Sequence, residues 1–63
     1  MSDDASRLRF LRTLATLDEP ARAHLLGKET EGELAQLFDV AMRHRMADVA
    51  ASIEVEADGL NQN

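Results

Sequence analysis

The fold of this chain depends most on residues 30–53, which read TEGELAQLFDVAMRHRMADVAASI. Thr30 and Glu33 have the spacing of a capping box, in which two side chains satisfy free backbone amides at the start of a helix. From Leu34 onward, apolar residues recur every three or four positions and form one slowly drifting stripe. The stripe comprises Leu34, Leu37, Phe38, Ala41, Met42, Met46, Val49 and Ile53. This pattern predicts one long helix over residues 31–53.

A first helix is expected near the amino end, over about residues 3–17. Ser2 or Asp3 can cap its free amide groups. Leucines recur at helical spacing along this segment and form an apolar stripe, while Arg9 and Arg12 fall on the opposite face. The segment is therefore predicted to be an amphipathic helix.

A second, short helix is expected over about residues 19–26. Asp18 is a plausible N-cap, and Pro20 is tolerated in a first helical turn because its missing N–H would be unpaired there. Gly27 is expected to end the helix with a positive φ. Each end of this helix thus has its own sequence signal.

The expected fold is all-α: three helices in a short bundle or hairpin, forming one domain over residues 1–53. Residues 54–63 are acidic and polar, so we expect a frayed tail there. A chain of 63 residues buries only about 60% of the surface that its unfolded form exposes. We therefore expect oligomerisation or a partner protein to complete the core.

The composition restricts the compartment and the class of partner. The net charge is −5, the wrong sign for a protein that binds a phosphate backbone, so no direct nucleic-acid binding is expected. No segment approaches the roughly 20 apolar residues that cross a bilayer. The acidic amino end does not resemble a signal peptide, and cysteine is absent. These features favour a cytoplasmic protein that is not associated with a membrane.

No arrangement of residues predicts catalysis. His44 and Asp48 lie four positions apart and could orient a base or supply two metal ligands, but a zinc site needs at least three protein ligands. The isolated glycines form no phosphate-binding loop, and three short helices have too little mass to enclose a nucleophile. We therefore expect no enzymatic activity, no metal, no cofactor and no small-molecule substrate.

The charges are distributed unevenly along the chain. Residues 1–28 carry five cations and four acids, a net of +1, whereas residues 29–63 carry two cations and eight acids, a net of −6. Such asymmetry suits steered association with a charged partner or head-to-tail self-association. A solvated surface without a binding role would explain it equally well.

The candidate partner-binding residues are charged or polar side chains on the first and third predicted helices. They are Arg9, Arg12, Arg43, His44, Arg45 and Asp48. Arg45 falls near the middle of the apolar stripe, and two interpretations remain open. Its stem could pack while its guanidinium reaches water, or it could be an arginine anchor within a binding face.

Part of this region resembles the Hha/YmoA family of small bacterial gene-expression modulators. The pattern Phe38-x-x-Ala41-x-x-His44-Arg45-x-Ala47-Asp48-Val49 is similar to the family's Phe-x-x-Ala-x-x-His-Arg-x-Ala-Glu-Leu. Three further segments extend the similarity over roughly residues 8–50: Phe10-Leu11-Arg12, Thr16-Leu17-Asp18 and Thr30-x-x-Glu33-Leu34. The family has an aspartate at the position of Arg43, and its fourth, tryptophan-containing helix has no predicted counterpart.

The resemblance implies an all-helical protein without enzymatic activity that docks on a histone-like nucleoid-structuring protein and adjusts gene silencing. Two classes of function follow from the whole sequence. One is a regulatory binding protein, either nucleoid-linked or an inhibitor or adaptor of the compact kind that phages and mobile elements encode. The other is a structural subunit that completes a larger helical assembly.

Overall fold

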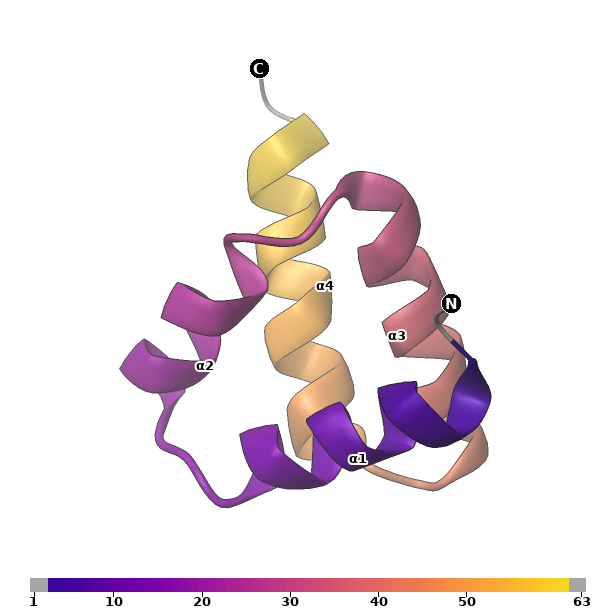
Figure 1. Ribbon diagram of the computed structural model, residues 1–63. Helices are drawn as coiled ribbons and strands as arrows, with labels where there is room; N and C mark the ends of the chain where they lie inside the picture. The colour runs from indigo at the N-terminus through magenta and orange to yellow at the C-terminus, as the bar shows by residue number, and fades with distance from the viewer. Residues whose placement is uncertain (1–2, 62–63) are drawn as a thin grey trace.

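The computed structural model describes residues 3–61, which form four α-helices joined by short turns (Figure 1). The helices are α1 (Asp4–Ala15), α2 (Glu19–Leu26), α3 (Glu31–Arg43) and α4 (Ala47–Asn61). No strand is present within residues 3–61, so the all-α prediction is confirmed. The first two helices lie within two residues of their predicted bounds.

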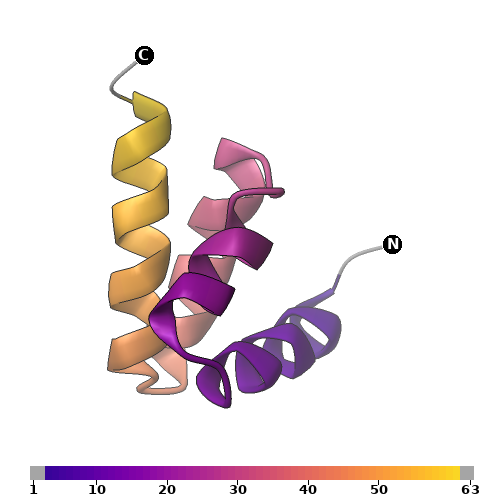
Figure 2. The ribbon, with the colours of Figure 1, turned by 90° about the vertical axis from the view of Figure 1, so that its left-hand side faces the viewer.

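α4 is the central element of the bundle. α3 and α4 are antiparallel neighbours, and α2 packs against α4 from the other side (Figure 1). α1 packs across α3 and α4 near the end at which these two helices are joined, as the view in Figure 2 also shows. All four helices therefore share one core.

The core consists of ten buried residues drawn from the four helices. They are Leu11, Leu14, Leu26, Leu34, Leu37, Val40, Ala41, Val49, Ala50 and Ile53. Of the stripe predicted over residues 31–53, Met42 is the member that lies largely outside the core, with 54% of its surface exposed. Val40 and Ala50 are buried although they were not assigned to that stripe.

The structure corrects the single helix predicted over residues 31–53. A turn at residues 44–46 divides it into α3 and α4. A continuous helix would have placed His44 and Arg45 beside the core, three and four positions after Ala41. Because burying these polar side chains without partners is costly, the chain turns at this point.

The turn has the hydrogen bonds of a Schellman motif. The Met46 N–H donates to the Ala41 carbonyl at 2.8 Å. The Arg45 N–H donates to the Met42 carbonyl at 3.1 Å. Arg45 occupies the left-handed position, with a φ of 57°, and Met46 packs against the core directly after it. The turn thus satisfies the last carbonyls of α3 although no glycine or proline marks it in the sequence.

α4 continues beyond the predicted helix end. Residues 54–61 are helical, so the prediction of a frayed tail is wrong for them, and residues 62–63 lie outside the described part of the chain. Ala57 packs against the core, and Ile53 is buried one turn earlier. This apolar contact accounts for the added length.

Gly27 ends α2 without the positive φ that the sequence suggested. Its φ is −63°, within the right-handed helical region. A Cβ at this position would lie 3.1 Å from the carbonyl oxygen of Ala23, which is closer than most side chains tolerate. The close approach of the backbone, and not a left-handed conformation, is therefore what favours glycine here.

Asp18 and Thr30 cap their helices as predicted, and of the two candidates for α1 the structure shows Asp3 as the cap. Each side chain accepts a hydrogen bond from the backbone N–H three positions later: Asp3 from Ser6 at 2.8 Å, Asp18 from Ala21 at 3.1 Å and Thr30 from Glu33 at 3.1 Å. Only the Thr30 half of the capping box is seen, because the Glu33 carboxylate accepts from Arg7. Such caps satisfy amides that the helix itself leaves free. The starts of α1, α2 and α3 are therefore fixed by local chemistry.

Candidate binding surfaces

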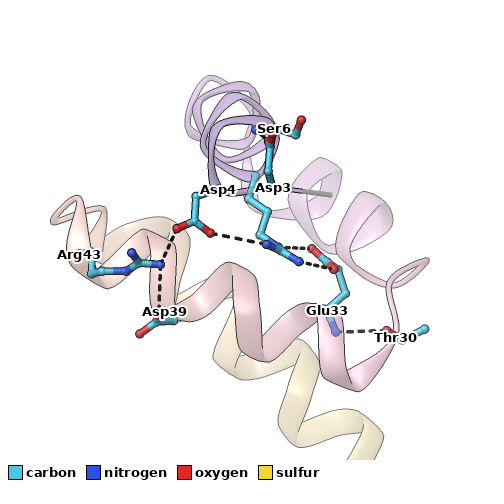
Figure 3. A network of polar contacts seen from close by, with 8 residues as sticks. Asp3, Asp4, Ser6, Thr30, Glu33, Asp39 and Arg43 are labelled. Atoms are coloured by element: carbon cyan, nitrogen blue, oxygen red, sulfur yellow. Dashed lines mark hydrogen bonds and ion pairs between the residues drawn. The ribbon is translucent and has the colours of Figure 1, made fainter. Parts of the chain in front are cut away.

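Arg7 of α1 and Glu33 of α3 form an ion pair between the two helices. The Arg7 Nε donates to Glu33 Oε2 at 2.9 Å, and a terminal nitrogen donates to Oε1 at 3.4 Å. Dashed lines in Figure 3 mark these bonds at the labelled Glu33. The side chains are only 16% and 25% exposed. Arg7 also lies 3.5 Å from Asp4. Both Glu33 oxygens thus accept hydrogen bonds from α1. This contact was not predicted, because no sequence pattern pairs residues 26 positions apart.

Arg43 is drawn into the same interface between α1 and α3. Its guanidinium donates to Asp4 at 3.2 Å and lies 3.0 Å from Asp39, one turn earlier on α3 (Figure 3). These side chains are more than half exposed, so the contact is screened by solvent. Arg43 therefore has a contact within the fold, whereas it was singled out from the sequence for partner binding.

His44 and Arg45 occupy the turn after α3, and both are exposed. This exposure fits both interpretations of Arg45, because a stem that packs would still leave the guanidinium in water. The left-handed backbone directs the side chain away from the path that a continuing helix would follow. We refer to His44 and Arg45 together as the turn corner.

The other predicted site residues are dispersed over different helices. Arg9 and Arg12 are exposed and one turn apart on α1, as expected. Asp48 lies in the first turn of α4. It lines an open groove of about 490 Å³ between α2 and α4, together with Glu19 and Arg22. The predicted residues therefore do not form one continuous site.

Arg22 has a structural role in the neighbouring turn. Its Nε donates to the carbonyl oxygen of Leu14 at 2.9 Å. The same carbonyl also accepts a hydrogen bond from the Leu17 N–H at 3.0 Å, so Arg22 adds a second bond at the end of α1. The bond also links α2 to α1. Arg22, the cation that lines the α2–α4 groove, is therefore engaged in a contact within the fold.

A second groove, of about 430 Å³, lies between α3 and α4. Seven residues line it: Glu31, Leu34, Ala35, Phe38, Ile53, Glu54 and Ala57. Leu34 and Ile53 are buried and form its base, whereas Ala35 is exposed at its edge. We call this surface the α3–α4 groove. It was not predicted, because the sequence was interpreted as one helix and a groove requires two.

Two charged groups have shifted pKa values with clear structural causes. The side-chain hydrogen bonds with Glu33 raise the pKa of Arg7 above its ordinary value. The backbone N–H of Ser6, at the start of α1, lowers the pKa of Asp3 below its ordinary value because it stabilises the carboxylate. Asp3 caps α1 and Arg7 links α1 to α3, so both pKa shifts indicate structural roles.

Within residues 3–61, no three His, Asp or Glu side chains gather in a way that could hold a metal ion. None of the helices described has the length and apolar character needed to span a bilayer. No protein-family model matches the chain, and no match was found among curated proteins or solved structures.

Proposed function

We propose that this chain is a small non-enzymatic regulatory protein that acts by binding another protein through the turn corner. The observation that carries the proposal is Arg45, an exposed arginine at a φ of 57°. A left-handed conformation costs a residue with a side chain about 1–2 kcal/mol. Glycine would avoid this cost, and it is the usual residue at this position of a Schellman motif.

An arginine at a strained backbone position suggests a function outside the fold. Backbone strain of this kind concentrates at functional sites, where the surrounding structure holds the strained residue in place. Here the hydrogen bonds of the turn and the packing of Met46 fix the backbone, so the guanidinium of Arg45 is presented on a rigid support. Arginine is also enriched among the residues that dominate protein interfaces.

The chemistry of the corner favours an acidic surface on the partner. Arg45 and His44 are adjacent and exposed, whereas Arg9 and Arg12 lie on α1 and are not part of this corner. The resemblance to the Hha/YmoA family is compatible with this corner, since its His-Arg pair falls on these two positions. The partner that it suggests is a nucleoid-structuring protein, so gene expression is the process we propose to be regulated.

The test is affinity capture from a lysate of the native host with the full chain as bait. Arg45→Gly removes the side chain while suiting the left-handed backbone, so this variant should melt at the same or a higher temperature than the wild type. Under the proposal, it nevertheless loses the captured partner. Lys28→Ala is the matched control, because it removes one exposed cation at another turn.

Each result of this experiment is decisive. A protein captured by the wild type and by Lys28→Ala, but not by Arg45→Gly, supports the proposal. Capture of a nucleoid-structuring protein would further support the suggested process. If every captured protein is retained by Arg45→Gly, the turn corner is not the binding surface and the proposal fails.

A further inference from the structure

The α3–α4 groove is a second surface with the features of a docking site. Five of its seven lining residues are apolar, whereas three of the eight that line the α2–α4 groove are apolar (Ala23, Ala51 and Val55). Phe38, one of two aromatic residues in the chain, is only partly buried there. Met42 lies one turn after Phe38 on the same face of α3 and is 54% exposed, which extends the apolar strip along the helix.

The charge around this groove has a single sign. Glu31 on α3 and Glu54 on α4 line it from opposite helices, and both are exposed. The described part of α4 contains four acids and no cation. A partner that places lysine or arginine beside the apolar strip would therefore meet complementary charge, whereas an acidic partner would be repelled.

From these features we infer that the α3–α4 groove binds a basic amphipathic helix of another protein. Both walls of the groove are helices whose backbone groups are bonded internally, so they offer no edge for an added strand. Recognition must then use side chains, as when the apolar face of a helix lies in a groove. Residues spaced i, i+3, i+4 and i+7 would contact Phe38 and Ala35, with flanking cations near Glu31 and Glu54. The inference concerns a different surface from the turn corner and does not rest on the proposed function.

A second copy of this chain suits the groove less well. A symmetric pair would place Glu31 and Glu54 of one copy near the same residues of the other. The exposed cationic face of α1, with Arg9 and Arg12, is otherwise polar because Thr13 and Thr16 share it. A symmetric pair thus brings no cation to the groove, and α1 of a second copy would bring cations without an apolar face. A separate protein is therefore the better occupant.

The experiment uses a labelled probe peptide of about 15 residues, long enough to form a helix when bound. Its leucines follow the i, i+3, i+4, i+7 spacing and its flanks carry lysine. A second peptide has glutamate in place of each lysine. Fluorescence anisotropy is measured with the full chain at low salt, and we expect the lysine peptide to bind and the glutamate peptide not to bind.

Three variants locate the binding. Ala35→Lys places a long cationic side chain at the groove edge of α3 without removing core volume. We expect it to lower the affinity for the lysine peptide by at least about tenfold. The double variant Glu31→Gln/Glu54→Gln should lower the affinity for the lysine peptide severalfold. Glu19→Gln/Glu56→Gln is the matched control, since it neutralises a first-turn glutamate of α2 and one glutamate of α4 at the other groove.

The outcomes separate the groove from general electrostatics and from self-association. Weakening by Ala35→Lys and by the groove pair, with the control pair and Arg45→Gly within about twofold of the wild type, supports the inference. It is overturned if the lysine peptide does not bind, if Ala35→Lys has no effect, or if both glutamine pairs weaken binding equally. It is also overturned if sedimentation equilibrium shows a dimer that Ala35→Lys dissociates, because the groove would then hold a second copy.

Discussion

α1 and α4 are attached to the same helix, α3, by different kinds of interaction. α1 contributes Leu11 and Leu14 to the core and is also held by the Arg7–Glu33 ion pair and by Asp4. α4 contributes three buried residues, Val49, Ala50 and Ile53. Its charged side chains are all acidic. The attachment of α1 therefore combines apolar and ionic contacts, whereas that of α4 depends mainly on apolar packing.

The apolar attachment of α4 explains why its carboxyl end could not be predicted from the local sequence. Acidic residues near the carboxyl end of a helix oppose its dipole, and α4 has Glu56 and Asp58 there with no basic residue in its last turn. Judged locally, this segment should fray. It stays helical because Ile53 and Ala57 pack against the core, and this tertiary contact outweighs the local preference.

The largest effect should come from removing the buried side chain that anchors α4. Ile53 is 1% exposed, so Ile53→Ala should lower the free energy of unfolding by about 2–5 kcal/mol, much of the total for a small domain. Urea denaturation followed by circular dichroism measures this. Val55→Ala is the control in the same helix: its side chain is 67% exposed, so its effect should stay within about 0.5 kcal/mol. Equal losses in the two variants would mean that α4 is not held by packing.

The next effect concerns the ionic attachment of α1. Glu33→Gln removes the charge that faces Arg7 and should lower the melting temperature by a few degrees at low salt. The loss should shrink only in part in about 1 M NaCl, because partly buried pairs are screened less than exposed ones. Asp39→Asn is the control, because the Asp39–Arg43 pair is largely exposed and should contribute little. A loss for Glu33→Gln no larger than that for Asp39→Asn would show that the Arg7–Glu33 pair does not hold α1.

These two attachments also mark what the sequence could and could not predict. The helix starts at Asp3, Asp18 and Thr30 were predictable because capping depends on residues three positions apart. The pairing of Arg7 with Glu33 was not, because it depends on how α1 crosses α3. Local chemistry thus fixes where helices begin, and packing fixes which of them meet.

The turn corner was predictable only in part. His44 and Arg45 stand where a continuing helix would have turned toward the core, so two polar residues at the phase of the apolar stripe were a signal of a break. The usual markers, glycine and proline, were absent, and Arg45 takes the glycine conformation instead. The residue was therefore recognised as unusual while the turn that explains it was missed. The α3–α4 groove was missed for the same reason.

A smaller effect should follow from a local change at the start of α3. Thr30 accepts a hydrogen bond from the Glu33 N–H at 3.1 Å, so Thr30→Ala should cost about 1 kcal/mol. Thr30→Ser keeps the hydroxyl and should cost much less. Because the cap is independent of the ion pair, the Thr30→Ala loss should persist in full at high salt, whereas that of Glu33→Gln should shrink in part. Loss of this salt difference would indicate that cap and ion pair act as one unit.

The smallest effect concerns Asp3, the cap of α1, and appears only as a dependence on pH. The Ser6 N–H lowers the pKa of Asp3 in the folded chain below the ordinary value of about 3.9. A group whose pKa is lowered on folding stabilises the fold above its unfolded pKa, and this contribution disappears as the pH falls through the folded pKa. Asp3→Asn keeps an acceptor for the Ser6 N–H but does not titrate. The wild type should therefore lose stability relative to Asp3→Asn as the pH is lowered from about 4 toward 2, and the difference should be constant above about pH 5. Melting curves of both proteins across this range measure it. A difference that instead changes between neutral pH and about pH 5 would show that a group other than Asp3 titrates at this end of α1.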